Sequence, residues 1–344
     1  MSNTNPFTIT FGKQPNMLIS RFEDTDRIIS TFNSDNPISQ VFMIEGIRGS
    51  GKTVLMTSIA NLLSDESDWI VINLNPTMDL LSNFALRLSK KCNIKSDVLS
   101  RGFSVSAYGF GVGINGEDTS DYVGIIEKSF KQIIKKRKKI LITIDEVLND
   151  DNMKVFASQF QIFIRQNYPI FLIMTGLREN INAIQNNPSL TFLLRSPKVV
   201  TGPLSILQIT HQYRDAFNVD NDRALELANY TKGYAFAFQA LGVCYYENAE
   251  CPDSIILEKL DELLDDFVYK KLWSSLTSRE KDIIHAMDCD EEKVGSISTQ
   301  LGVSAGTLSK YKDSLIEQGI VESSRYGYIR ITLPRFLEVT RNYK

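Results

Sequence analysis

The segment from Gly46 to Thr53 combines residue types that can hold a chain of phosphate groups. Its sequence, Gly-Ile-Arg-Gly-Ser-Gly-Lys-Thr, matches the Walker A pattern GxxxxGK[ST] at every fixed position. The glycines let backbone N–H groups point inward around phosphates, and the following helix directs its positive dipole end at them. We expect Lys52 to reach the β- and γ-phosphates of a nucleotide and the Thr53 hydroxyl to bind Mg²⁺. The predicted nucleotide-contacting residues are Gly46, Ile47, Arg48, Gly49, Ser50, Gly51, Lys52, Thr53 and Val54.

The flanking sequence supports this prediction. An apolar run from Val41 to Ile44 leads into the loop, and a helical run from Val54 to Leu63 follows it. This order of strand, loop and helix is the one in which the motif binds phosphate. Guanine-specific proteins of this class usually carry an Asn-Lys-x-Asp sequence, and the chain has none. We therefore expect ATP or ADP rather than a guanine nucleotide.

A second apolar run, Ile140 to Ile144, ends in two carboxylates, Asp145 and Glu146, as a Walker B strand does. We expect Asp145 to join the magnesium shell and Glu146 to polarise the water that attacks the γ-phosphate. The alternative is an acidic pair at the start of a helix, where carboxylates favour the positive dipole end.

A third apolar run, Ile170 to Met174, ends at a polar residue, Thr175. Its hydroxyl is a candidate contact for the attacking water or the γ-phosphate, and the alternative is a cap for the helical pattern that follows.

Short apolar runs recur between longer helical patterns through the first two hundred residues. Runs that are apolar on both faces and separated by helices indicate a parallel sheet covered on each side, so we predict a three-layer α/β domain. The predicted strands are Gln40 to Glu45, Trp69 to Leu74, Ile140 to Asp145, Ile170 to Thr175 and Lys198 to Thr201.

After Pro203 the strand patterns stop and four helical patterns follow, which predicts a helical lid. From Trp273 onward the pattern is helix, turn, helix and two short strands, the order of a winged helix-turn-helix. The predicted domains are therefore residues 1–205 for the P-loop core, 206–272 for the lid and 273–344 for the winged helix.

Two segments allow two interpretations each. The run Lys135 to Lys139 is either a nucleic-acid patch or a helix C-terminus whose cations favour the negative dipole end. The glycine-rich segment Leu99 to Thr119 is either a projecting hairpin or a mobile loop.

Composition limits the classes of protein further. The formal net charge of −3 gives no strong overall attraction for nucleic acid or anionic membrane, so any such binding requires a local patch. The four cysteines show no metal-ligand spacing, and we expect reduced thiols. Residues Met1 to Pro6 lack the features of a signal peptide, and no apolar run is long enough to span a membrane. We expect a cytoplasmic protein without membrane contact.

Taken together, the two motifs, the polar strand tip, the lid and the winged helix resemble AAA+ ATPases of the initiator-like branch, akin to origin-recognition proteins. They are also similar to the signal-transduction ATPases with numerous domains. The resemblance implies a five-stranded sheet of order 5-1-4-3-2, with the Thr175 strand between the two motif strands. It also places Arg195 where these ATPases carry an arginine that reaches the γ-phosphate of a neighbouring subunit, which implies a homo-oligomer or a protein partner. The alternative is an ordinary surface arginine. The lid segment Gly233 to Phe236 departs from the family because it offers no arginine to the nucleotide, which implies slow hydrolysis or a switch.

The winged helix is predicted to contact either DNA, or instead a protein or another part of the same chain. Between Trp273 and Lys344, ten Lys and Arg balance ten Asp and Glu, although phosphate neutralisation requires a basic surplus. The leading hypothesis is an ATP-hydrolysing protein that couples nucleotide state to assembly or DNA engagement. The alternatives are a nucleotide-gated regulatory switch with little turnover and a DNA-binding regulator. Candidate DNA contacts are Thr307, Ser309, Lys310, Lys312, Arg325 and Arg330.

Overall fold

The computed structural model describes residues 5–10, 15–94, 116–341 and 343. The chain forms two compact units. The sheet unit consists of Arg21–Glu45 and Thr53–Val200, and the lid unit consists of Met1–Ser20, Gly46–Lys52 and Thr201–Lys344. The predicted hairpin at Leu99 to Thr119 lies outside the described residues except for its last four positions, which begin a helix.

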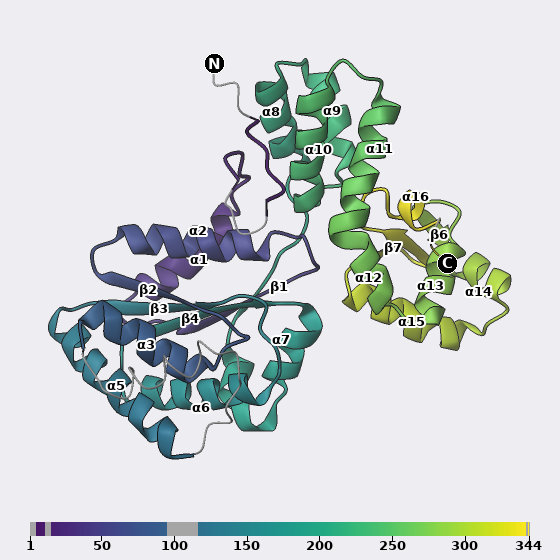
Figure 1. Ribbon diagram of the computed structural model, residues 1–344. Helices are drawn as coiled ribbons and strands as arrows, with labels where there is room; N and C mark the ends of the chain where they lie inside the picture. Colours follow the sequence, from purple (N-terminus) through teal and green to yellow (C-terminus); the bar gives the residue numbers. More distant parts are fainter. Residues whose placement is uncertain (1–4, 11–14, 95–115, 342, 344) are drawn as a thin grey trace, which may run out of the picture. The chain divides into compact units, whose positions relative to one another are not determined.

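The sheet unit contains five parallel strands in the order β2-β3-β4-β1-β5 (Figure 1). This order confirms the predicted one, and the strand bounds agree with the predicted runs within one residue at each end. The strands are β1 (Val41–Glu45), β2 (Trp69–Leu74), β3 (Lys139–Ile144), β4 (Ile170–Gly176) and β5 (Lys198–Val200).

Each face of the sheet is covered by helices, so side chains on both faces of a strand are buried. Phe42 and Ile44 of β1 pack under α1 (Phe22–Asn33) and α2 (Lys52–Asp65). Val41 and Met43 belong to a second hydrophobic cluster on the opposite face. The helices of that face are α3 (Leu80–Cys92), α5 (Gly116–Lys135), α6 (Asp151–Arg165), α7 (Arg178–Gln185) and the 3₁₀ segment η1 (Pro188–Arg195).

The lid unit begins with the predicted helices and continues into a winged helix. The lid elements are α8 (Ile206–Phe217), α9 (Asn221–Tyr230), α10 (Ala235–Asn248), α11 (Asp253–Leu264), the π-helical turn η2 (Asp265–Tyr269) and α12 (Lys270–Ser275). The winged helix comprises α13 (Ser278–His285), β6 (Glu291–Lys293), α14 (Val294–Leu301), α15 (Ala305–Glu317), β7 (Val321–Arg325), β8 (Tyr328–Ile331) and α16 (Phe336–Thr340). Its strands form an antiparallel sheet of order β6-β8-β7, one strand more than predicted.

The lid and the winged helix share one hydrophobic cluster. Tyr269 is buried in it and donates a hydrogen bond of 2.6 Å to the Pro334 carbonyl. Arg335, beside α16, forms an ion pair with Asp261 of α11. These contacts join the two parts into one body, whereas the domain boundaries predicted at Ser205 and Leu272 stay predictions.

The structure also shows where the basic run and the four cysteines lie. Helix α5 ends at Lys135 and β3 begins at Lys139, so the basic run lies between a helix end and a buried strand. All four cysteines are free thiols. None of the described helices is long and apolar enough to cross a membrane.

Candidate nucleotide site

The P-loop (Gly46 to Thr53) connects β1 to α2 through backbone conformations that glycine favours. Gly49 and Gly51 have φ angles of 75° and 91°, a region that strains residues with a Cβ atom. The buried Lys52 ammonium donates hydrogen bonds to the Gly46 carbonyl at 3.0 Å and the Ile47 carbonyl at 2.8 Å. The Lys52 ammonium is thus held by carbonyls of the loop itself, and its contact with nucleotide phosphates stays a prediction.

Residues of the lid form hydrogen bonds with the same loop. The Tyr234 hydroxyl donates to the Arg48 carbonyl at 2.5 Å, and the Phe236 N–H donates to the Gly49 carbonyl at 3.0 Å. Burial raises the pKa of Tyr234 well above its ordinary value, so its hydroxyl remains a donor. The main chain of the loop is therefore tied to the start of α10.

The winged helix also contacts the loop. Gly319, between α15 and β7, has a φ of 74°, and a Cβ there would lie 2.6 Å from the Ile47 Cγ2 atom. A larger residue at this position would be strained by the backbone angle and would crowd the Ile47 side chain. One face of the P-loop is consequently packed by two separate parts of the lid unit.

In the sheet unit, the predicted magnesium ligands lie next to each other. The Thr53 hydroxyl, in the first turn of α2, is 2.9 Å and 3.2 Å from the two carboxylate oxygens of Asp145. One hydroxyl beside one carboxylate suits Mg²⁺, which usually takes its other ligands from phosphate and water. No group of three or more His, Cys, Asp or Glu that fits a metal occurs among the described residues.

Thr175 lies at the tip of β4 and holds the acidic turn in place. Its buried hydroxyl donates to Asp145 and accepts the Glu146 N–H at 3.1 Å, while its carbonyl accepts the Val147 N–H at 2.8 Å. Glu146 is exposed and has a φ of 54°, uncommon for a residue with a side chain. Such conformations persist where the surrounding contacts enforce them and cluster at functional sites.

Solved structures of the same architecture align with nearly the entire chain. The Walker-type ATPase of Pyrococcus abyssi has a TM-score of 0.66 at 14% identity, with 94% of this chain and 96% of that chain covered. The ORC2 protein of Aeropyrum pernix, in ADPNP–ADP complexes, has a TM-score of 0.59 at 13% identity, covering 97% and 96%. The ORC1 protein of the same organism, in complex with DNA, has a TM-score of 0.50 at 14% identity, covering 96% and 95%. The chain has the fold of the initiator-like AAA+ ATPases.

A comparison of the sequence with protein families adds a match in one part of the chain. A family described as "Domain of unknown function (DUF8462)" matches residues 266–338, which include most of the winged helix. A search of the curated proteins found no match.

Arg195, the predicted contact to a neighbouring subunit, is exposed at the end of η1 in the sheet unit. An exposed Arg195 side chain can reach another copy of the chain, and its contact with the γ-phosphate there stays a prediction.

A charge cluster around the buried Glu45 was not predicted from the sequence. Glu45, the last residue of β1, is 5% exposed and pairs with Arg178 at 3.2 Å and Lys198 at 3.4 Å. The cluster joins the end of β1 to the first residue of α7 and the first residue of β5, and it holds the strand that precedes the P-loop. The available signal was a carboxylate at the end of an otherwise apolar strand, because such a group requires cationic partners once buried.

Proposed function

We propose that the chain binds ATP with Mg²⁺ at the P-loop and hydrolyses it, and that its nucleotide state governs assembly or DNA engagement. The observation that carries this proposal is the contact between the Thr53 hydroxyl and the Asp145 carboxylate. These two residues come from motifs 92 positions apart, and each motif predicts a ligand of the same ion. The nucleotide and DNA complexes of the fold's neighbours agree with the proposal.

The residues have separate tasks in this proposal. Lys52 exchanges the Gly46 and Ile47 carbonyls for phosphate oxygens, because an ammonium gains more from an anion than from neutral acceptors. Thr53 and Asp145 hold the magnesium ion, which neutralises charge on the phosphates. Glu146 takes the proton of the attacking water. Thr175 orients both acids, and Arg195 of a neighbouring copy stabilises the charge that develops on the γ-phosphate.

Two variants test the assignments separately. We expect Lys52→Ala to lose ATP binding in calorimetry with Mg²⁺. We expect Glu146→Gln to retain binding but lose turnover by about 10²- to 10⁴-fold, since only the proton acceptor is removed. Normal hydrolysis by Glu146→Gln would exclude this residue as the base, and undiminished binding by Lys52→Ala would exclude the loop as the site.

A second candidate function is a nucleotide-gated switch with little turnover. It is favoured by the hydrogen bond from Tyr234 to the Arg48 carbonyl and by the packing of Gly319 against Ile47. A phosphate that reshapes the loop would then act directly on the lid and the winged helix. Purified protein that retains ADP and shows negligible multiple turnover would select this function, whereas rapid sustained turnover would select the first.

A further inference from the structure

Thr201, the residue that follows β5, contacts the P-loop through a pair of hydroxyl groups. Its Oγ1 atom lies 2.6 Å from the Ser50 Oγ atom, and the two residues are buried, at 5% and 4% exposed. Both residues belong to the lid unit. The P-loop motif does not extend to Thr201, and the proposed function gives this residue no task.

The direction in which the hydroxyl protons point follows from a second contact of Ser50. The Ser50 hydroxyl donates a hydrogen bond of 2.8 Å to the Ile47 carbonyl. Because a hydroxyl group carries a single proton, the Ser50 oxygen is the acceptor toward Thr201, and the Thr201 hydroxyl is the donor. The hydrogen bonds therefore run from Thr201 through Ser50 to the Ile47 carbonyl.

The Ile47 carbonyl also accepts a hydrogen bond of 2.8 Å from the Lys52 ammonium. In the proposed function this ammonium moves to phosphate oxygens when a nucleotide binds, so the carbonyl loses a donor. Loss of a donor raises the free energy of a partly buried acceptor unless another donor bonds it. The Ser50 hydroxyl supplies that donor, at a shorter distance than the 3.3 Å of the Ser50 N–H.

Thr201 keeps the Ser50 hydroxyl in the orientation that this task requires. A side chain without a donor at position 201 would allow the Ser50 proton to turn away from the Ile47 carbonyl. Gly46 leaves the space for the pair, since a Cβ atom there would lie 2.1 Å from Thr201 Oγ1 and 2.7 Å from Ser50 Oγ. The first glycine of the motif thus makes room for two hydroxyl groups on the side of the loop that faces Thr201.

We propose that Thr201 is a positioning residue for nucleotide binding, which acts through the Ser50 hydroxyl on the carbonyl that releases Lys52. This rests on the nucleotide part of the proposed function and adds a residue from outside both motifs. The Leu204 N–H donates a hydrogen bond of 2.7 Å to the Gly233 carbonyl, so the segment that carries Thr201 is anchored within the lid unit.

The experiment measures the affinity of the full chain for ATP and for ADP, each with Mg²⁺, by calorimetry. Thr201→Val keeps the shape of the side chain but removes the donor, and we expect both affinities to fall about 3- to 10-fold, as for one hydrogen bond. Thr201→Ser retains the hydroxyl and should bind nearly as tightly as wild type. In Thr201→Val the KM for ATP should rise by a similar factor with kcat little changed, because the loop holds the phosphates before and during the reaction.

A double-mutant cycle tests the route through Ser50. Ser50→Ala removes the hydroxyl that lies between Thr201 and the Ile47 carbonyl, so the addition of Thr201→Val should weaken nucleotide binding no further. Additive losses would overturn the proposal. A Thr201→Ser variant as weak as Thr201→Val would also overturn it, because the hydroxyl would then have no effect.

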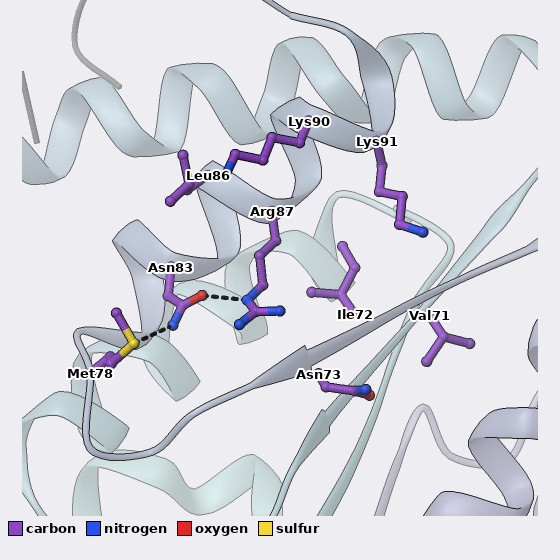
Figure 2. Close-up of a pocket in the computed structure, with 9 residues that line it drawn as sticks. All are labelled: Val71, Ile72, Asn73, Met78, Asn83, Leu86, Arg87, Lys90 and Lys91. Carbon is purple, nitrogen blue, oxygen red and sulfur yellow. Dashed lines mark hydrogen bonds between the residues drawn. The ribbon is translucent and has the colours of Figure 1, made fainter. Parts of the chain in front are cut away.

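Two controls remove buried hydrogen-bonding side chains elsewhere. Thr210→Val in the lid unit removes a hydroxyl that donates 2.8 Å to a carbonyl of its own helix, α8. Asn83→Ala in the sheet unit removes a side chain of the pocket between β2 and α3, which Figure 2 shows with hydrogen bonds to Arg87 and Met78. Both controls should lower the unfolding midpoint but bind nucleotide as wild type does. Equal weakening of nucleotide binding by the controls and Thr201→Val would overturn the proposal.

The proposed function and the role of Thr201 fail on different results. Absence of ATP binding by the wild-type chain would overturn both. Normal ATP binding by wild type, together with an unchanged affinity in Thr201→Val, would overturn the role of Thr201 alone.

Discussion

The Thr175 hydroxyl donates a hydrogen bond to the Asp145 carboxylate, and the same oxygen accepts the N–H of Glu146. A single buried hydroxyl thus contacts both residues of the Walker B motif, Asp145 through its carboxylate and Glu146 through its backbone N–H. This arrangement makes Thr175 a positioning residue in the proposed reaction. Its effect should pass through the metal ligand and the base rather than through direct contact with the nucleotide.

The first prediction separates these roles. Thr175→Val keeps the shape of the side chain but removes both hydrogen bonds, so we expect magnesium-dependent turnover to fall about 10- to 100-fold, as for other residues that orient metal ligands. ATP affinity without Mg²⁺ should change little. Thr175→Ser retains the hydroxyl and should restore most of the turnover. A magnesium titration of the hydrolysis rate makes the measurement, and a Ser variant as weak as the Val variant would contradict it.

The second prediction concerns the link between the lid and the loop. Tyr234→Phe removes the donor to the Arg48 carbonyl, which should cost about 1 kcal/mol of stability and accelerate ADP release. Tyr213→Phe is the matched control, because its buried hydroxyl donates to the Phe238 carbonyl within the lid and not to the P-loop. Stopped-flow release of a fluorescent ADP analogue should distinguish the two variants. Equal release rates would disprove the link.

The bounds of the central strands were predictable because their residues are mostly apolar, whereas the strand order came from the family resemblance. Their apolar runs carry the signal locally, and covering both faces of a sheet requires it. Strand β6 was missed for the converse reason. Its residues, Glu291, Glu292 and Lys293, have no strand-like pattern, and they extend only because β8 pairs with them.

The sequence motifs predicted which residues form the site, but not which residues those side chains contact. The P-loop motif specifies Lys52 and Thr53, and the strand ends specify Asp145 and Thr175. The hydrogen bond between Thr175 and Asp145 depends on β4 lying beside β3, which came only from the family resemblance. The contact of Gly319 with Ile47 joins positions far apart in the chain, and no local pattern marks it.

The third prediction is a dependence of stability on pH. Burial alone would raise the pKa of Glu280, but hydrogen bonds from Ser314, Thr277 and Gln318 outweigh it and lower the pKa. Because the folded-state pKa lies below the unfolded value of about 4.3, ionised Glu280 stabilises the fold above that pH. The contribution is lost as pH falls through the lowered pKa.

The measurement for Glu280 is the unfolding midpoint as a function of pH, followed by circular dichroism. Glu280→Gln cannot ionise, so wild type should exceed it in stability near neutral pH and approach it in acid. Glu322→Gln is the control, since this carboxylate is exposed on the wing. Parallel pH curves for wild type and Glu280→Gln would refute the assignment.

The fourth prediction tests whether the winged helix responds to the P-loop. Gly319→Ala introduces a Cβ at a φ of 74° and 2.6 Å from Ile47 Cγ2, so it should separate the two elements and alter nucleotide affinity. Gly327→Ala carries the same backbone strain of about 1 kcal/mol at a φ of 77° but meets no atom within 4 Å, which isolates the contact from the strain. Because Ile47→Ala removes the opposing methyl group, its combination with Gly319→Ala should restore affinity, giving a coupling that a double-mutant cycle measures by calorimetry. Additive effects of the two changes on nucleotide affinity would show that the contact does not couple the winged helix to the P-loop.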